Sequence, residues 1–282
     1  MVRPMSGNER AKYPVKSLAK ALRLLEFLGK PQEGTSIAVL SKELKIGKST
    51  VHRLLATLRE FDLVWLDPTT SNYALGARIL RWSDLLVRQN LLIRHGLPIL
   101  RELMNTSKET ANLAVLEGNE VLYVAQCESN ERLRTSEAVG TRAPAHSTSL
   151  GKVLFAMLPE EHFDEVYKNS ESLERVTPNT ITERSRLKVH LQKVRQEGVA
   201  YDFEENVIGV VCIGTVVRDF AGQPVAGLSI SVPTQRVRGD NLSALKEQLL
   251  SAAHKLSAEL GYEAPSKRST RNELASPVEI LH

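Results

Sequence analysis

Residues 37–58 read IAVLSKELKIGKSTVHRLLATL, and the spacing of apolar residues in this stretch predicts two short helices joined by a tight turn. In the first helix Ile37, Leu40 and Leu44 recur at i, i+3 and i+7, and Ser36 stands where an N-terminal cap is expected. The turn at 45–47 should need a small residue, here Gly47, because the two helices meet there at a steep angle. The second helix is expected to bury Val51, Leu54, Leu55 and Leu58. This arrangement is typical of a helix-turn-helix, whose second helix enters the major groove of DNA.

The opposite side of the second helix is polar and basic. Short hydroxyl groups at a helix N-terminus suit phosphate oxygens, which also gain from the unpaired N–H groups there. Arg53, one turn further along, can reach either a guanine edge or a phosphate, and His52 is more often a surface residue than a base reader. The residues expected to contact DNA, in this helix and beside it, are Ser36, Lys48, Ser49, Thr50, His52, Arg53, Thr57, Thr69 and Thr70.

The segments on either side of this stretch complete a small domain. Ser17 is expected to cap a first helix that Gly29 ends, and its apolar residues fall on one stripe. Residues 63–66 and 73–75 flank a turn at 67–72 and predict a hairpin, or wing, directly after the second helix of the motif. We therefore expect a winged helix-turn-helix over residues 15–76, preceded by a mobile basic arm at residues 1–14.

Charge is divided unevenly along the 282 residues. Residues 1–95 carry 16 Lys and Arg against 8 Asp and Glu, a net charge of +8, whereas the rest carries 21 against 25, a net charge of −4. A basic front end on an acidic body indicates a nucleic-acid-binding module fused to a second domain, although a solvated Lys-rich surface would look the same.

The composition also limits the compartment and the chemistry. No run of about 18 apolar residues predicts a membrane span, and residues 1–14 have no apolar core of a signal peptide. The two cysteines, Cys127 and Cys212, form no disulfide framework and no metal-ligand spacing. We expect a cytoplasmic protein with no cofactor and no metal.

Three stretches, SLAKALRLLE (17–26), GKSTVHRLL (47–55) and YALG (73–76), resemble the IclR family of bacterial transcription regulators, and the match covers residues 14–262. The resemblance implies a linker helix over 77–95 that pairs with its twin and holds two winged modules on two half-sites, with Trp82 at the dimer contact. A helix packed on its own domain would show the same apolar pattern. Residues 61–65 depart from the family, whose members usually have a glycine before the aromatic residue or valine, which leaves the path into the wing open.

Residues 96–262 read as an α+β domain. Strands are predicted at 110–117, 120–126, 133–139, 210–217 and 225–231, and helices at 91–104, 149–158, 182–197 and 241–260, with Pro98 in a first turn or at a kink. The resemblance implies a GAF/PAS-like antiparallel sheet with flanking helices. Residues 263–282 are polar, lack periodicity and are expected to be disordered.

This second domain is expected to bind a ligand rather than to catalyse a reaction. Period-two spacing puts Ser229 and Ser231 on one face of a strand, and with Cys212 and the helix N-terminus near Ser149 they could hold a small carboxylate. From spacing alone, serines that face solvent and a cysteine that only packs remain an alternative. The resemblance implies an effector pocket lined by Leu133, Ser136, Ala145, Leu150, Gly151, Asp202, Cys212, Ser229 and Ser231. There Asp202 would accept ligand hydroxyls. Arg134 and Arg142 are candidate partners for a ligand carboxylate, although both are more often surface charges.

These observations predict a sequence-specific, DNA-binding transcription regulator that represses a catabolic operon. It would bind a double-stranded operator with two half-sites as a homodimer or homotetramer, under the control of a small organic acid, for which a sugar-derived acid is one candidate. An architectural DNA-binding protein is an alternative. A small-molecule enzyme is another, because His146 lies near Ser147 and Ser149, but no G-x-S-x-G motif is present.

Overall fold

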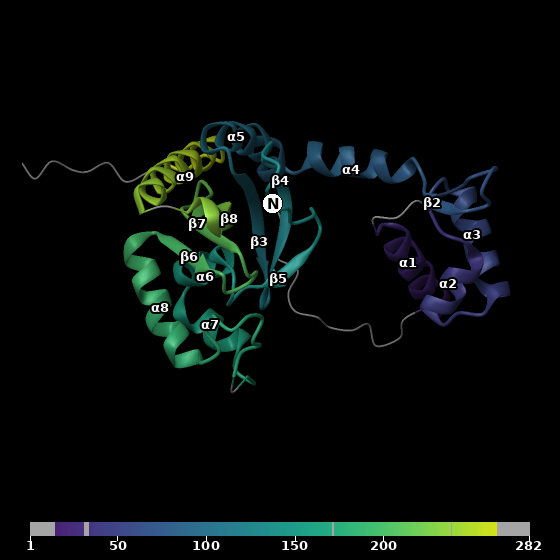
Figure 1. Cartoon of the computed structure of the whole chain (residues 1–282), viewed down its shortest axis with the longest axis horizontal. Coiled ribbons are helices and arrows are strands. Elements are labelled where there is room, and N and C mark those ends of the chain that lie inside the picture. The colour runs from purple at the N-terminus through teal and green to yellow at the C-terminus, as the bar shows by residue number, and fades with distance from the viewer. Residues whose placement is uncertain (1–14, 31–33, 171, 238, 264–282) are drawn as a thin grey trace, which may run out of the picture.

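A computed structural model describes residues 15–30, 34–170, 172–237 and 239–263. Figure 1 shows a small helical part and a larger sheet-containing part that are connected by one helix, α4. The predicted basic arm, and all but the first residue of the predicted tail, lie outside the described residues. Within the described part of the chain, no helix is long and apolar enough to span a membrane.

The small part is a winged helix-turn-helix, as predicted. Its elements are α1 (Lys16–Leu28), α2 (Ile37–Leu44), α3 (Lys48–Glu60), β1 (Val64–Leu66) and β2 (Tyr73–Leu75). The two strands pair in antiparallel register, and Thr35, just before α2, forms a bridge with Tyr73 of the wing. Residues from all three helices and from the wing share one core, which includes Leu24, Leu40, Val51, Leu55 and Tyr73.

Two local predictions about the helices of this part are wrong. The helix α1 begins at Lys16, and no side chain caps it, so Ser17 is not its N-cap. In the α2–α3 turn the left-handed residue is Lys45, with φ of 53°, whereas Gly47 has φ of −57° and a Cβ added to it would meet nothing within 4 Å. The turn is therefore sharp because Lys45 ends α2 in the left-handed conformation, and it does not depend on a small residue at position 47. By contrast, Ser36 caps α2 as predicted and accepts a hydrogen bond from Val39 N.

The path from α3 into the wing is settled by Asp62 and Gly76. Asp62 has φ of 57°, a left-handed conformation that aspartate adopts more readily than most residues other than glycine. Gly76 follows the wing and packs against this turn, because a Cβ added to it would lie 2.1 Å from the Asp62 carbonyl oxygen. The departure from the family pattern thus leaves the wing intact.

The linker helix expected over 77–95 ends earlier than predicted, and the separate helix predicted over 91–104 follows it directly. The first is α4 (Arg78–Gln89), which has no buried residue, and the second is α5 (Leu91–Ser107). Asn90 separates them in an extended conformation, and its side chain accepts a hydrogen bond from Ile93 N as the N-cap of α5. Pro98 lies in the interior of α5 and not in its first turn.

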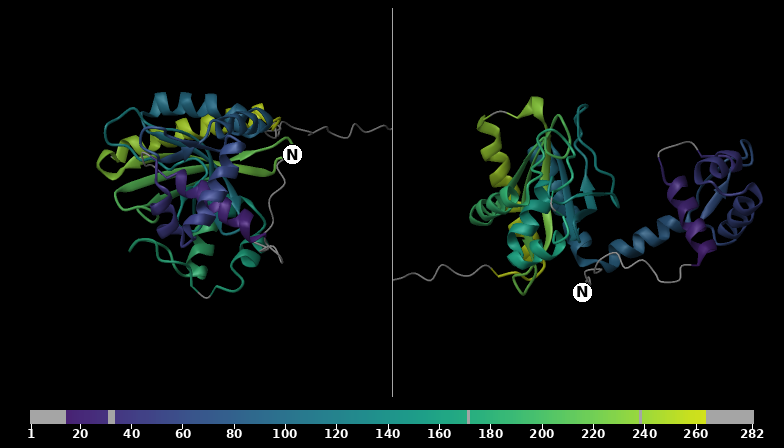
Figure 2. Two further views of the ribbon diagram at one scale, coloured as in Figure 1. Left: turned by 90° about the vertical axis from the view of Figure 1, so that its right-hand side faces the viewer. Right: turned by 90° about the horizontal axis from the view of Figure 1, so that it is seen from below.

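The larger part is a three-layer α+β sandwich. Its antiparallel sheet has the order β5-β4-β3-β8-β7-β6, with strands β3 (Thr110–Glu117), β4 (Glu120–Cys127), β5 (Arg142–Pro144), β6 (Val199–Phe203), β7 (Val210–Arg218) and β8 (Pro224–Pro233). One face is covered by α5 and α9 (Gly239–Glu259), which Figure 2 shows lying together. The other face is covered by α6 (Ser149–Met157) and α8 (Arg184–Glu197), with α7 (Glu160–Val166) beyond them. A short 3-10 helix, Thr234–Arg236, follows β8.

The strand predicted at 133–139 does not form. This segment lies between β4 and β5 without regular secondary structure. It is held instead by single hydrogen bonds, in which Thr110 Oγ1 donates to Thr135 O and Arg236 donates to Leu133 O, each at 2.7 Å. The neighbouring strand β4 pairs with Arg142–Pro144 and not with this segment.

Candidate functional site

The recognition helix α3 presents a polar face to solvent. Lys48, Ser49, His52, Arg53 and Thr57 are exposed, while Val51, Leu55 and Leu58 are buried on the opposite side. Thr50 and Leu54 are only half-buried, so the expected burial of Leu54 is incomplete. Six of the nine predicted DNA contacts therefore lie on one helix, and five of them are exposed to solvent.

The other three predicted contacts flank that helix. Ser36 caps α2, and the wing tip carries Thr69 and Thr70, both exposed. The wing turn is organised by Asp67, whose carboxylate accepts hydrogen bonds at 2.8 Å from Thr69 N and from the Thr70 hydroxyl. These bonds lower the pKa of Asp67. The hydroxyl group of Thr70 thus already has a role in the turn.

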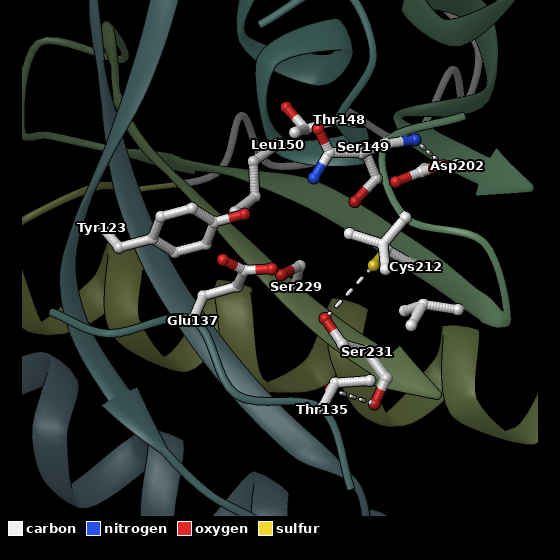
Figure 3. A pocket seen from close by; sticks show the side chains of 13 residues that line it. Tyr123, Thr135, Glu137, Thr148, Ser149, Leu150, Asp202, Cys212, Ser229 and Ser231 are labelled. Carbon is white, nitrogen blue, oxygen red and sulfur yellow. Dashed lines mark hydrogen bonds between the residues drawn. The ribbon is translucent and has the colours of Figure 1, made fainter. Parts of the chain in front are cut away.

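A pocket lies on the α6 side of the sheet in the larger part (Figure 3). The strands supply Tyr123, Asp202, Val210, Cys212, Ser229 and Ser231. The start of α6 supplies Thr148, Ser149 and Leu150. The connecting segments supply Thr135 and Glu137 on one side, and Asn206 and Val207 on the other.

Strand register explains why the polar strand residues meet. Asp202 on β6 pairs with Cys212 on β7, which pairs with Ser231 on β8, so these three side chains form a row across the sheet. Ser229 lies two residues before Ser231 and therefore on the same face. The relative exposures of Ser229 and Ser231 are 1 % and 4 %, which excludes the alternative that they face solvent.

A buried polar network joins this row. The Asn112 side chain on β3 donates to Ser231 Oγ at 3.1 Å and lies 3.4 Å from Ser229 Oγ, and Gln126 donates to Asn112 Oδ1 at 2.8 Å. Cys212 Sγ and Ser231 Oγ are 3.2 Å apart. Burial raises the pKa of the Cys212 thiol, so the group stays protonated and is a wall of the pocket rather than a nucleophile.

Of the nine residues predicted for this site, five line the pocket, namely Leu150, Asp202, Cys212, Ser229 and Ser231. Two other residues predicted for the site, Leu133 and Ser136, do not line this pocket. Leu133 is exposed, and Ser136 donates outside the pocket to Glu128, while its neighbours Thr135 and Glu137 line the pocket instead.

Ala145 and Gly151 are also predicted lining residues that do not line the pocket. They are buried against each other, and a Cβ added to Gly151 would lie 2.1 Å from the Ala145 carbonyl oxygen. Their contact places the first turn of α6 close to the preceding segment. The remaining lining residues that were missed, such as Tyr123 and Asn206, carry no local signal because they come from distant strands and loops.

The positive end of α6 faces the pocket. Thr148 caps the helix and accepts a hydrogen bond from Gly151 N at 3.0 Å. The N–H groups of Ser149 and Leu150, which occupy the first two helical positions, have no acceptor within the helix and can bind an anion. Arg134 pairs with Glu128 and Arg142 pairs with Glu117, so both arginines are the surface charges that the sequence favoured and neither contributes to the pocket.

Asp202 is the most perturbed acid in the pocket. Its carboxylate accepts hydrogen bonds from Glu205 N at 2.6 Å and Asn206 N at 3.3 Å, so it holds the β6–β7 loop. Burial nevertheless raises the pKa of Asp202 to about 7, while the nearby ammonium group of Lys152 acts in the opposite direction. Lys152 itself is fully buried in α6 and donates to the Glu205 carboxylate.

The pocket is nearly closed. Its cavity volume is ≈ 20 Å³, which is enough for about one water molecule. A larger groove of ≈ 220 Å³ lies between α6, α7 and α8. Its cationic groups are already engaged, because Arg195 donates to two main-chain carbonyls and Lys188 pairs with Asp164, so the small pocket is the better candidate for a specific ligand.

Family models match both parts of the chain. The IclR helix-turn-helix domain matches residues 17–68, and the C-terminal domain of the bacterial transcriptional regulator IclR matches residues 85–258. The chain belongs to the IclR family of transcription regulators. Members of this family bind DNA and are regulators rather than enzymes.

Similar IclR-family proteins include regulators and a structure with a ligand. The chain is 34% identical to the HTH-type transcriptional regulator KdgR of Escherichia coli over 92% of this chain and 98% of that protein. It is 29% identical to the HTH-type transcriptional repressor AllR of Salmonella typhi over 93% of this chain and 96% of that protein. An IclR homologue from Microbacterium hydrocarbonoxydans, solved in complex with 4-hydroxybenzoate, is 25% identical with a TM-score of 0.74, covering 86% of this chain and 98% of that one.

The residues that suggested a hydrolase do not form a catalytic pair. The His146 ring lies 2.8 Å from the main-chain oxygen of Glu174, and the Ser147 hydroxyl is 3.0 Å from Asn206 Oδ1. Ser149 lines the pocket at the start of α6. Among the described residues, neither serine hydrogen-bonds to the imidazole.

Proposed function

We propose that this IclR-family regulator represses a catabolic operon and that a small organic acid bound in the closed pocket controls its affinity for DNA. The supporting observation is the pocket itself, in which a helix N-terminus, two buried serines and a buried carboxyl group converge on one small space. AllR, a relative over nearly the whole chain, is named a repressor, and a homologous structure contains an aromatic acid. Because the partner is DNA, we place the protein in the cytoplasm.

The hydrogen-bonding groups that line the pocket each have a role in binding the acid. The ligand carboxylate would accept hydrogen bonds from the N–H groups of Ser149 and Leu150, since no lysine or arginine lines the pocket. Ser229 and Ser231 would donate to ligand oxygens, and Asp202 would accept from a ligand hydroxyl. A sugar-derived acid fits this pattern.

Ligand entry requires movement. A cavity that holds one water cannot hold an organic acid, so residues 131–139 or the β6–β7 loop must shift when the acid binds. The loop carries Asn206 and Val207 into the pocket and is tied to Asp202. A ligand that binds the shifted arrangement more tightly raises the population of that arrangement. Under this proposal the shifted and unshifted arrangements differ in their affinity for DNA, so ligand binding in the pocket is coupled to DNA binding.

We propose that α4 pairs with its counterpart in a second copy, as a homodimer or dimer of dimers. The helix buries no residue, and the exposed fractions of Leu80, Trp82 and Leu86 are 74%, 50% and 60%.

Trp82→Ala is expected to weaken self-association by about 2 kcal/mol, roughly 30-fold, because large aromatic residues dominate such contacts. Sedimentation equilibrium of Trp82→Ala beside the neighbouring Arg81→Ala measures this, and equal dimer affinity in both variants would remove Trp82 from the contact.

Replacing Arg53 with alanine tests the DNA interface. We expect operator affinity to fall by about 1–3 kcal/mol, since Arg53 is exposed on the recognition helix and a base or phosphate contact is worth that much. Fluorescence anisotropy on a promoter fragment measures the effect, with Arg59→Ala as the control. Arg59 is also exposed but lies about 240° further around α3. Wild-type affinity in Arg53→Ala would remove Arg53 from the interface.

Footprinting on the same promoter fragment, together with titration of unrelated DNA, separates a regulator from an architectural DNA-binding protein. A regulator protects a footprint with two symmetric half-sites, whereas an architectural protein binds unrelated DNA equally well. Adding an acid identified by a thermal-shift screen should then release the fragment. An acid that binds tightly but leaves operator affinity unchanged would contradict the proposed control.

A further inference from the structure

Glu137 is the one pocket residue whose charged group is left without a partner. It lies on the segment between β4 and β5, half-buried, and its carboxylate makes no hydrogen bond or ion pair within the described residues. Figure 3 shows its carboxylate pointing into the pocket from the side opposite Asp202. Asp202, by contrast, is satisfied by two main-chain N–H groups.

The position of Glu137 is imposed by the fold. Thr135 and Glu137 both point inward because they alternate with Ser136, which is tied to Glu128 on the outer side. The segment is anchored at Thr135, whose carbonyl oxygen accepts the hydrogen bond from Thr110 Oγ1 at 2.7 Å, and Gly140 N donates to Tyr123 O at 2.8 Å. Glu137 thus reaches the pocket from between two fixed points.

An unpaired carboxylate in such a site costs stability, since partial burial removes some of its water without supplying donors. Burial raises the pKa of Glu137, in line with this cost. No cationic side chain lines the pocket, so the protein offers no counter-charge there. A ligand donor would remove the cost, and the group is therefore placed to recognise one.

We propose that Glu137 determines the specificity of the pocket by accepting a hydrogen bond from a hydroxyl group at the end of the effector away from its carboxylate. The effector is then a small hydroxy acid rather than an unsubstituted acid. This inference rests on the proposed function, in which the acid carboxylate binds the start of α6.

A hydroxyl group fits the surroundings better than an ammonium group. The walls near Glu137 carry hydroxyl groups, including Tyr123 and Ser229, which can donate as well as accept. A ligand hydroxyl can donate to Glu137 and accept from one of these neighbours. An ammonium group has three donors and no acceptor, so it would leave the neighbouring hydroxyl donors unpaired.

The test uses the full-length chain and two sets of acids, and the three acids in each set share one carbon skeleton. Isothermal titration calorimetry compares 3-hydroxypropanoate with propanoate and β-alanine, and 5-hydroxypentanoate with pentanoate and 5-aminopentanoate, so that two lengths of reach are covered. In the wild type we expect one hydroxy acid to bind roughly tenfold to a hundredfold more tightly than its unsubstituted partner, as for a hydrogen bond to a charged group.

Three variants test whether the preference for a hydroxy acid comes from Glu137. Glu137→Leu should abolish the preference while retaining binding of the unsubstituted acid, and Glu137→Gln should keep part of it because its amide oxygen still accepts. Glu131→Gln, which changes an exposed carboxylate on the same segment, should behave as wild type. Circular dichroism melting checks that each variant is folded.

The outcomes distinguish a failure of the role proposed for Glu137 from a failure of the proposed effector binding. If acids bind but the hydroxyl preference is absent from the wild type or survives in Glu137→Leu, the proposed function stands and the role of Glu137 is refuted. Tightest binding of an amino acid would also refute it and would point to an ammonium ligand. If no acid binds the wild type at either length, the inference fails together with the function on which it rests.

Discussion

Replacing Lys152 with methionine is expected to lower the free energy of unfolding by about 3–5 kcal/mol, the usual result of removing one partner of a buried ion pair. Lys152 is fully buried, and its ammonium group pairs with Glu205, which is 6% exposed. Without the lysine, the Glu205 carboxylate is left in a dry site with no counter-charge. The nearby Asp202 loses the same cation, so the cost extends to the pocket.

Urea unfolding followed by circular dichroism measures this loss. Lys255→Met is the matched control, because Lys255 pairs with Glu102 at the surface and such pairs contribute at most about 1 kcal/mol. The double variant Lys152→Met/Glu205→Leu should recover much of the stability, since it removes both charges. Equal losses in Lys152→Met and Lys255→Met would show that the buried pair contributes no more than a surface one.

Gly151→Ala is expected to destabilise the larger part of the molecule by about 3 kcal/mol or more, beyond the usual cost of overpacking. The added Cβ would lie 2.1–2.5 Å from three main-chain atoms of Ala145. Main-chain atoms cannot rotate away as a side chain can, so the start of α6 must separate from the preceding segment. Because that contact positions Ser149 and Leu150 at the pocket, ligand binding should be lost as well.

Thermal and urea unfolding of Gly151→Ala and Gly47→Ala provide the comparison. Gly47 has negative φ and open space around its Cβ position, so its substitution should change stability by at most about 1 kcal/mol. A Gly151→Ala variant as stable as Gly47→Ala would mean that α6 can move away from Ala145 without cost.

Local sequence patterns predicted most of the fold. The i, i+3, i+7 spacing placed α2 and α3, and the turn-flanked apolar runs placed the wing, because these elements are determined by contacts within a few residues. Period-two spacing likewise put Ser229 and Ser231 on one face. The predicted strand at 133–139 failed because pairing depends on a partner strand, and β4 pairs elsewhere.

The candidate site was harder to predict than the fold. Leu133 and Ser136 were assigned to the pocket, whereas Thr135 and Glu137 line it, since an extended segment with no ladder gives no local sign of which face is inward. Tyr123 and Asn206 join the site from separate strands and loops. The pairing of Lys152 with Glu205 links residues 53 positions apart, and no spacing rule connects them.

The sequence by itself determined the winged helix-turn-helix, the polar face of α3 and the position of Ser229 and Ser231 on one face of β8, because helical and strand periods encode which residues share a side of an element. Only the tertiary structure decided that Asp202, Cys212 and Ser231 form one row, that Glu137 points at them without a partner, and that α6 aims its N-terminus into the same space. The physical reason is that register across strands and the closure of loops depend on contacts between distant residues, which periodicity does not encode.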